Sequence, residues 1–204
     1  MKWTSTVSFL GKTFHWNFQV FKTPSCRTGG MSARIPGTAS FCIFLDFDNI
    51  RDEVLKGELT DLQELFQLGD FHIIATNKFG RHAICVDRMS MREVLAVISE
   101  STCDYHFKQG IHVNEYRSWV LRVLAKGNRP KPQYCYSLES QYNGQNLQSS
   151  AHATFLQVYY KAPVRLVNPD GNYELGIQSY MTASHLDARK LGEMDMPKIL
   201  GEAK

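Results

Sequence analysis

Residues 41–48 read Phe41-Cys-Ile-Phe-Leu-Asp-Phe-Asp48, and this stretch decides the fold that the rest of the chain must fit. Side chains of a β-strand alternate between its two faces. The four hydrophobic side chains at the odd positions from 41 to 47 therefore share one face, whereas Asp46 and Asp48 project from the other. We expect a strand that packs its apolar face against helices and presents two carboxylates on an open face.

The segments that follow predict the order β-α-β-β-α-β. Residues 50–67 carry leucine and phenylalanine at helical spacing, and a Ser-x-x-Glu capping box at 90–93 opens a second helix. Strands are predicted over 71–76, 82–86 and 102–107. This order is the split unit of ferredoxin-like and RNA-recognition-motif folds, so the predicted fold class is α+β, with additional N- and C-terminal strands and helices around that core.

The length of 204 residues indicates a single domain over 1–204. Within it we expect an N-terminal strand over 14–21 and a loop over 24–39, a catalytic core over 40–138, and a C-terminal extension over 139–204. The end of the core reads as a hairpin of strands over 119–125 and 133–138. The extension is predicted to hold a helix over 150–161 and short strands over 163–180.

Composition excludes several classes of protein. Hydrophobic residues make up 43% of the chain and charged residues 21%, which is ordinary for a globular protein and excludes disordered and fibrous classes. No apolar run is long enough to span a membrane and no signal peptide is recognised, so no membrane partner is expected. Five widely spaced cysteines without a Cys-x-x-Cys pair predict free thiols in a reducing compartment such as the cytoplasm.

Alternation along the predicted strands gathers acidic side chains on one face. On the strand over 102–107, Asp104 projects beside Asp46 and Asp48, and the strand over 82–86 brings His82 close to them. Carboxylates that approach one another repel unless a divalent cation neutralises them, and oxygen ligands suit Mg²⁺ or Mn²⁺. The alternative is that Asp46 and Asp48 only end a strand and cap the next helix, and that His82 is an ordinary hydrogen-bonded histidine.

The turn before His82 combines cations with a glycine. Lys78, Gly80 and Arg81 precede the imidazole, and two cations, a close backbone approach and an imidazole suit the oxyanions of a triphosphate. A half-buried histidine beside a solvated turn explains the same residues equally well.

Basic residues are concentrated between the predicted core strands. The chain carries a net charge of only +3, yet the window 117–131 holds five cations and no acid. Trp119 lies among them and Tyr116 and Tyr134 flank them, a pattern compatible with phosphate contacts and base stacking. A solvated basic hairpin is the alternative. The five cations are Arg117, Arg122, Lys126, Arg129 and Lys131.

Three of these segments, in this order, resemble the motifs of the archaeo-eukaryotic primase (primase-polymerase) superfamily over about residues 40–135. Leu45-Asp46-Phe47-Asp48 resembles the first motif, an apolar strand that ends in Asp-x-Asp/Glu. Gly80-Arg81-His82 resembles the second, in which serine usually stands in place of glycine. Cys103-Asp104 is similar to the third. The basic strand from Arg117 to Lys126 resembles the one that follows in these enzymes.

The resemblance implies a nucleotidyltransferase that carries out template-directed primer synthesis or DNA polymerisation by a two-metal mechanism. Asp46, Asp48 and Asp104 would be catalytic and would bind Mg²⁺ or Mn²⁺. The implied partners are a single-stranded DNA template, an NTP or dNTP, and a replicative helicase. Residues implied in nucleotide binding are Lys78, Gly80, Arg81, His82, Arg122 and Lys126. Residues implied in nucleic-acid binding are Arg117, Trp119, Arg129 and Lys131.

Two other functions compete with this interpretation. A haloacid-dehalogenase-like phosphatase would use Asp46 as its nucleophile, but such a sheet needs a βαβ crossover where this sequence returns at once to a strand at His82. A non-catalytic single-stranded nucleic-acid-binding module would stack bases on aromatic residues of the open face. Aspartates on that face would repel phosphate in the absence of metal.

Overall fold

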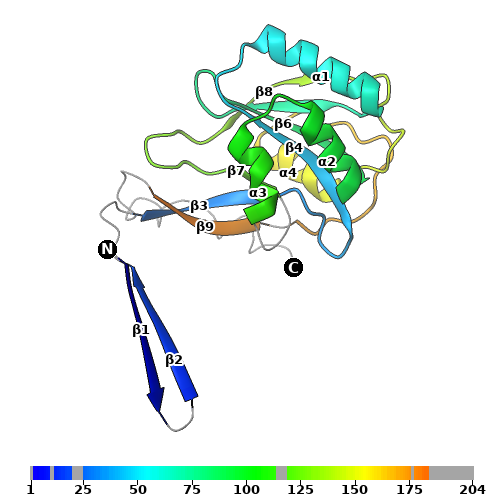
Figure 1. The fold of residues 1–204 in the computed structure, drawn as a ribbon. Coiled ribbons are helices and arrows are strands. Elements are labelled where there is room, and N and C mark those ends of the chain that lie inside the picture. Colours follow the sequence, from blue (N-terminus) through cyan, green and yellow to red (C-terminus); the bar gives the residue numbers. More distant parts are fainter. Residues whose placement is uncertain (1, 10–11, 20–24, 114–118, 176, 184–204) are drawn as a thin grey trace.

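The computed structural model describes residues 2–9, 12–19, 25–113, 119–175 and 177–183. It is an α+β protein built from antiparallel sheets and four helices in the described part of the chain (Figure 1). Among the described residues, no helix combines the length and the apolar character needed to cross a membrane.

A four-stranded antiparallel sheet forms the centre of the molecule. Its strand order is β4-β6-β5-β8, and the two helices α1 and α2 follow β4 and β6 along the chain. The predicted sequence of strand, helix, two strands and helix is therefore present from residue 40 to residue 100. These elements are β4 (Ser40–Phe47), α1 (Asp52–Phe66), β5 (Phe71–Ala75), β6 (Arg81–Ser90), α2 (Met91–Glu100) and β8 (Gln133–Leu138).

The remaining strands and helices come before β4, after β8, or between α2 and β8 in sequence. A second sheet has the order β7-β3-β9, and β1 pairs with β2 alone. These strands are β1 (Lys2–Phe9), β2 (Lys12–Gln19), β3 (Ser25–Ser32), β7 (Val120–Arg122) and β9 (Ile177–Ala183). The remaining helices are α3 (Tyr105–Val113) and α4 (Ser150–Tyr159), the latter as predicted.

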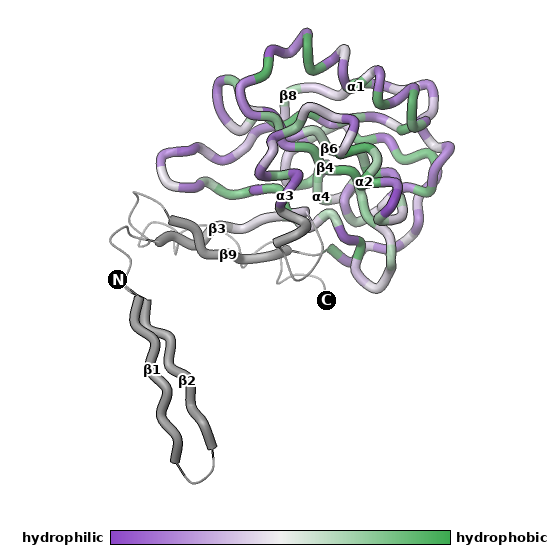
Figure 2. The backbone as a smooth tube through the Cα atoms, in the orientation of Figure 1, coloured by the Kyte–Doolittle hydropathy of each residue, from purple (hydrophilic) through white to green (hydrophobic). Residues whose placement is uncertain are grey.

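Local sequence explains why α1 and α2 form where they do. Three leucines at positions 55, 59 and 62 give α1 its buried stripe, and most of its exposed residues are polar, apart from Val54 and Leu65 (Figure 2). The predicted capping box opens α2: the Ser90 hydroxyl accepts from the Glu93 amide at 3.3 Å, and the Glu93 carboxylate accepts from the Ser90 amide at 2.7 Å.

The second face of the sheet is covered, so the prediction of an open face is wrong. Cys42 and Phe44, on the same face as Asp46, are both fully buried. Helix α4 lies against this face, because the ring of Phe44 meets His152 edge-on at 5.7 Å and His152 Nε2 lies 2.9 Å from the carbonyl of Ser32. Burial on both faces accounts for the unbroken apolar run of β4. The side chain of Asp46 remains partly exposed because it lies near the end of the strand.

The predicted fourth strand over 102–107 is wrong, since α3 begins at Tyr105. The Asp104 carboxylate accepts a hydrogen bond from the amide of Phe107 at 2.9 Å, as an N-cap residue does, and this bond favours the helix. The chain nevertheless passes along the edge of β4, because the amide of Asp104 donates to the carbonyl of Asp46 at 2.7 Å. Asp104 thus reaches the predicted neighbourhood by a loop instead of a strand.

The predictions for the flanking segments also need correction. The expected loop over 24–39 contains β3, and the single expected strand near the N-terminus is the hairpin β1–β2. The expected hairpin of 119–125 with 133–138 does not form: β7 pairs with β3, and β8 pairs with β5. Burial of Trp119 and Leu121, at 2% and 1% exposure, draws β7 into the second sheet.

Candidate active site

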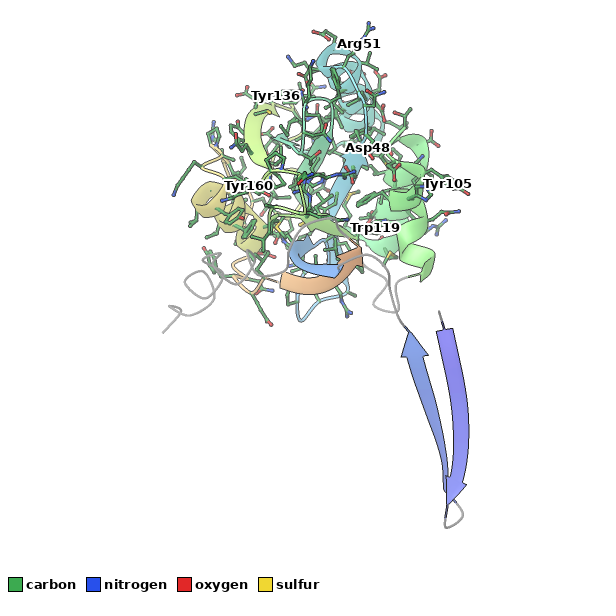
Figure 3. All side chains as sticks on the ribbon, turned by 90° about the vertical axis from the view of Figure 1, so that its left-hand side faces the viewer. Asp48, Arg51, Tyr105, Trp119, Tyr136 and Tyr160 are labelled. Carbon is green, nitrogen blue, oxygen red and sulfur yellow. The ribbon has the colours of Figure 1, made fainter. Side chains whose placement is uncertain are left out.

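The predicted site residues meet at one end of the central sheet, where β4 and β5 end and β6 begins. Asp46 and His82 stand opposite each other on neighbouring strands. The loop after β4 is tied to the turn between β5 and β6 by a hydrogen bond of 3.0 Å from the amide of Ile50 to the carbonyl of Phe79. Figure 3 shows Asp48 in this region, between Tyr105 of α3 and Tyr160 of α4 in that view.

Asp46 is the central group of the site. Its side chain is 30% exposed, and its Oδ1 lies 3.5 Å from Nε2 of His82. The pKa of Asp46 is raised to about 7, first by burial and then by the negative charges of Asp48 and Asp104, while Arg122 and Arg129 oppose the rise. The three predicted carboxylates therefore lie within electrostatic reach of one another, with two arginines close by.

His82 is neutral in this environment. The residue is 4% exposed, and burial lowers the pKa of its imidazole to about 3, with the charge of Arg122 acting in the same direction. Its contact with Asp46 is therefore between a neutral ring and a carboxyl group, not an ion pair. The imidazole lies next to Asp46 and brings no positive charge to a phosphate.

The carboxylates suit a hard cation in chemistry but are not assembled around one. Within the described residues, no group of three or more His, Cys, Asp or Glu side chains is close enough to hold a metal ion as it stands. One Asp104 oxygen is engaged by the start of α3. The alternative role for Asp46 and Asp48 as helix caps is not found, because α1 begins at Asp52 and its N-cap residue, Arg51, makes no side-chain capping bond.

The turn between β5 and β6 is built by Asn77. Its Oδ1 accepts from the amides of Phe79 and Gly80 at 2.8 and 2.7 Å. A Cβ at position 80 would lie 2.7 Å from Asn77 Nδ2 and would also meet the hydroxyl of Thr76. The turn therefore has no room for a serine side chain at this position, although serine is usual there in the motif that the segment resembles. Lys78 is exposed on this turn.

Arg81 does not join the predicted triphosphate site. It projects from the face opposite to that of His82, and its guanidinium pairs with both oxygens of Asp52 at 3.0 and 3.2 Å. Further bonds run to backbone carbonyls of its own turn, among them that of Gly80 at 3.0 Å. The charge of Arg81 is therefore paired with Asp52, the first residue of α1.

Arg122 reaches the site but not in the predicted role. The residue is 7% exposed, and its guanidinium donates to the carbonyls of Leu124 at 2.7 Å, Pro130 at 2.9 Å and Thr76 at 3.4 Å. These bonds hold backbone, so the group is not presented to a nucleotide. Its positive charge still acts on Asp46 and His82.

Of the residues predicted to contact nucleic acid, some are buried and others are exposed. Trp119 is 2% exposed and belongs to the core, so the prediction that it stacks on bases is wrong. Arg129 and Lys131 are exposed, and Lys126 is half-buried. Lys131 lies over the ring of Tyr159, with Nζ 3.8 Å from the centroid. Arg117 lies outside the described residues.

Comparison of the chain with protein-family models, with curated protein sequences and with solved structures finds no match. The site is therefore argued from its own residues. Two of its features have no signal in the sequence: the pairing of Arg81 with Asp52, and the carbonyls that surround Arg122. Asn77 could have been found, since asparagine before a glycine-containing turn commonly bonds to its own backbone.

Proposed function

We propose that this chain is a nucleotidyltransferase that performs template-directed primer synthesis or DNA polymerisation with an NTP or dNTP and Mg²⁺ or Mn²⁺. The observation that carries the proposal is the convergence of Asp48 and Asp104 on Asp46, where burial first and then these two charges raise the pKa of Asp46 to about 7. Carboxylates that repel one another destabilise the folded protein unless a cation neutralises them, so this arrangement favours a cation-binding role.

The arrangement of the elements supports the proposal. The strand order β4-β6-β5, with α1 and α2 in the connections, is that of three strands of a ferredoxin-like sheet. The segment at Asp104 runs beside β4, where the fourth strand of such a sheet would lie. The segments that carry the resemblance lie along this edge of the sheet, which supports the proposal, and a loop and α3 stand where a fourth strand was expected.

The chemistry of the donor set fits a hard divalent cation. Asp46 and Asp48, with Asp104 beside them, offer only carboxylate oxygens, which Mg²⁺ and Mn²⁺ prefer. When bound, such an ion would activate a 3′-hydroxyl and neutralise charge on the phosphate. His82 lies next to Asp46, and the exposed Arg129, with the half-buried Lys126 near it, would meet phosphate oxygens.

Both competing functions fit the fold less well. A phosphatase with Asp46 as nucleophile requires a parallel, doubly wound sheet, whereas β4, β6, β5 and β8 are antiparallel. A binding module of the RNA-recognition type requires an exposed sheet face. Here α4 lies against that face, and Phe44 is fully buried. A location in the cytoplasm or nucleoid and a helicase partner would follow from the proposed activity.

The test is incorporation of labelled nucleotides on primed and unprimed single-stranded DNA with Mg²⁺ or Mn²⁺. Asp46→Asn and Asp48→Asn should each lower incorporation on the order of 10²-fold or more, because each removes a charge that acts on the transferring phosphate. Asp61→Asn, at an exposed acid on α1, is the matched control and should leave incorporation unchanged. Absence of incorporation with either metal, together with Asp46-dependent hydrolysis of a phosphomonoester, would favour the phosphatase.

A further inference from the structure

We infer that Arg122 is a positioning residue: its guanidinium closes the basic loop 124–130 and holds Arg129 beside the carboxylates, and Arg129, not Arg122, contacts the phosphates of the nucleotide. The contact with nucleotide rests on the proposed function. The positioning itself is a property of the free protein and is testable without it.

The guanidinium joins both ends of the loop. One nitrogen, Nη1, donates to the carbonyl of Leu124 at 2.7 Å and to that of Pro130 at 2.9 Å, which are the residues where the loop leaves and returns. The other, Nη2, lies 3.4 Å from the carbonyl of Thr76 at the end of β5. A single side chain therefore fixes the base of the loop to the central sheet, and only arginine has the planar set of donors for this.

The tip of the loop is rigid in its own right. The amide of Lys126 donates to the carbonyl of Arg129 at 3.0 Å, and the amide of Arg129 donates back at 2.9 Å. Gly127 has a φ of 61°, the left-handed value that the first central residue of a tight hairpin turn adopts. The tip thus presents the side chains of Lys126 and Arg129 from fixed backbone positions.

Tyr159 of helix α4 contacts the residues that flank the loop 124–130 and so attaches the loop a second time. The ammonium of Lys131 lies 3.8 Å from the ring centroid of Tyr159, and the hydroxyl of Tyr159 donates to the carbonyl of Val123 at 2.9 Å. The loop is therefore held on its inner side by Arg122 and on its outer side by Tyr159.

The two arginines differ in what a ligand can reach. Arg122 is 7% exposed and bonded to three carbonyls, whereas Arg129 is exposed and close enough to Asp46 to oppose the rise in its pKa. A polyphosphate that approaches the carboxylates with a metal ion would meet Arg129 first. Arg122 would then influence binding only through the backbone that it holds.

The first measurement is amide hydrogen exchange over residues 124–131 of the protein without nucleotide. Arg122→Lys keeps the charge but cannot bridge the carbonyls, so exchange in this loop should rise by about tenfold or more. Arg88→Lys is the matched control, because Arg88 is also partly buried and bonds to Asp170 away from the loop. Unchanged exchange in the Arg122→Lys loop would overturn the inference, whether or not the protein acts on nucleotides.

The second measurement is a double-mutant cycle on the affinity for dATP with Mn²⁺. Arg122→Lys and Arg129→Gln should each weaken binding by about tenfold or more, and the double variant should bind no more weakly than Arg129→Gln alone. Losses that multiply in the double variant would show that Arg122 meets the phosphates directly. Gly127→Val disturbs the tip without touching the core and should reproduce the loss, which keeps the test decisive if Arg122→Lys fails to fold.

Discussion

Glycines at two positions show how much a single Cβ matters in this chain. Gly80 sits against Asn77 and Thr76 in the turn beside the site, whereas Gly57 lies in the middle of α1 with nothing within 4 Å of the place a Cβ would take. The first glycine is required by crowding, and the second is a conformational weakness in a helix.

We expect Gly80→Ala to lower the free energy of unfolding by about 1–3 kcal/mol, because the new methyl group must displace a side chain that already holds two turn amides. Gly57→Ala should raise it by about 0.5–1 kcal/mol. Denaturant titration of both variants measures the two effects. A neutral Gly80→Ala would mean that Asn77 can move aside without loss.

Among the elements, α3 most directly links folding to the candidate site. Its start uses the Asp104 carboxylate as a cap, and the same residue is bonded through its amide to β4. A residue in this position can serve the helix, the metal or both.

Asparagine and alanine separate these roles. Asp104→Asn caps a helix about as well as aspartate, so stability should be kept, whereas Asp104→Ala should lose about 1 kcal/mol. If Asp104 also binds metal, both variants should weaken Mn²⁺ binding alike, as measured by calorimetry on the protein. An Asn variant with wild-type Mn²⁺ affinity would assign Asp104 to the helix alone.

At the scale of the whole molecule, buried ionisable groups tie stability to pH. Burial lowers the pKa of His72 to about 4, that of His82 to about 3 and that of His152 to about 4. The unfolded chain protonates these rings below pH 6.5, and the folded protein does not until far lower pH. Their contribution to stability is therefore present above pH 6.5 and is lost as the pH falls towards 4.

Asp46 acts in the opposite direction. Its pKa is raised from 3.8 to about 7 in the folded protein, so between these values the folded state holds a proton that the unfolded state has released. Its contribution therefore falls as the pH rises from about 4 to 7.

The balance of these groups predicts acid sensitivity. Below pH 6.5 the unfolded chain gains three histidine protons against the one held by folded Asp46, a net of about two protons. The free energy of unfolding should then fall by about 2–3 kcal/mol per pH unit as the pH drops from 6 to 5. Urea titrations across this range measure the slope, and His72→Gln should reduce it by about one proton. A flat profile would contradict the burial of these rings.

Local patterns were sufficient for the order of the core elements and for part of the site. Alternation along 41–47 placed Asp46 on the face opposite to Leu45 and Phe47, helical spacing placed α1, and the capping box placed the start of α2. Each of these depends on neighbours within one or two turns of chain, so it can be inferred from spacing alone.

Contacts between distant segments decided the rest. The sequence by itself determined which residues are acidic, basic or apolar on each strand and helix, and hence that carboxylates and cations are available to this face. Only the tertiary structure decided that α4 covers the face through the contact of His152 with Phe44, that Asp52 takes Arg81 away from it, and that backbone carbonyls enclose Arg122. The partners of a buried polar group are set by whatever chain packs around it, because the group must find its hydrogen bonds there, and spacing along the sequence does not specify that packing.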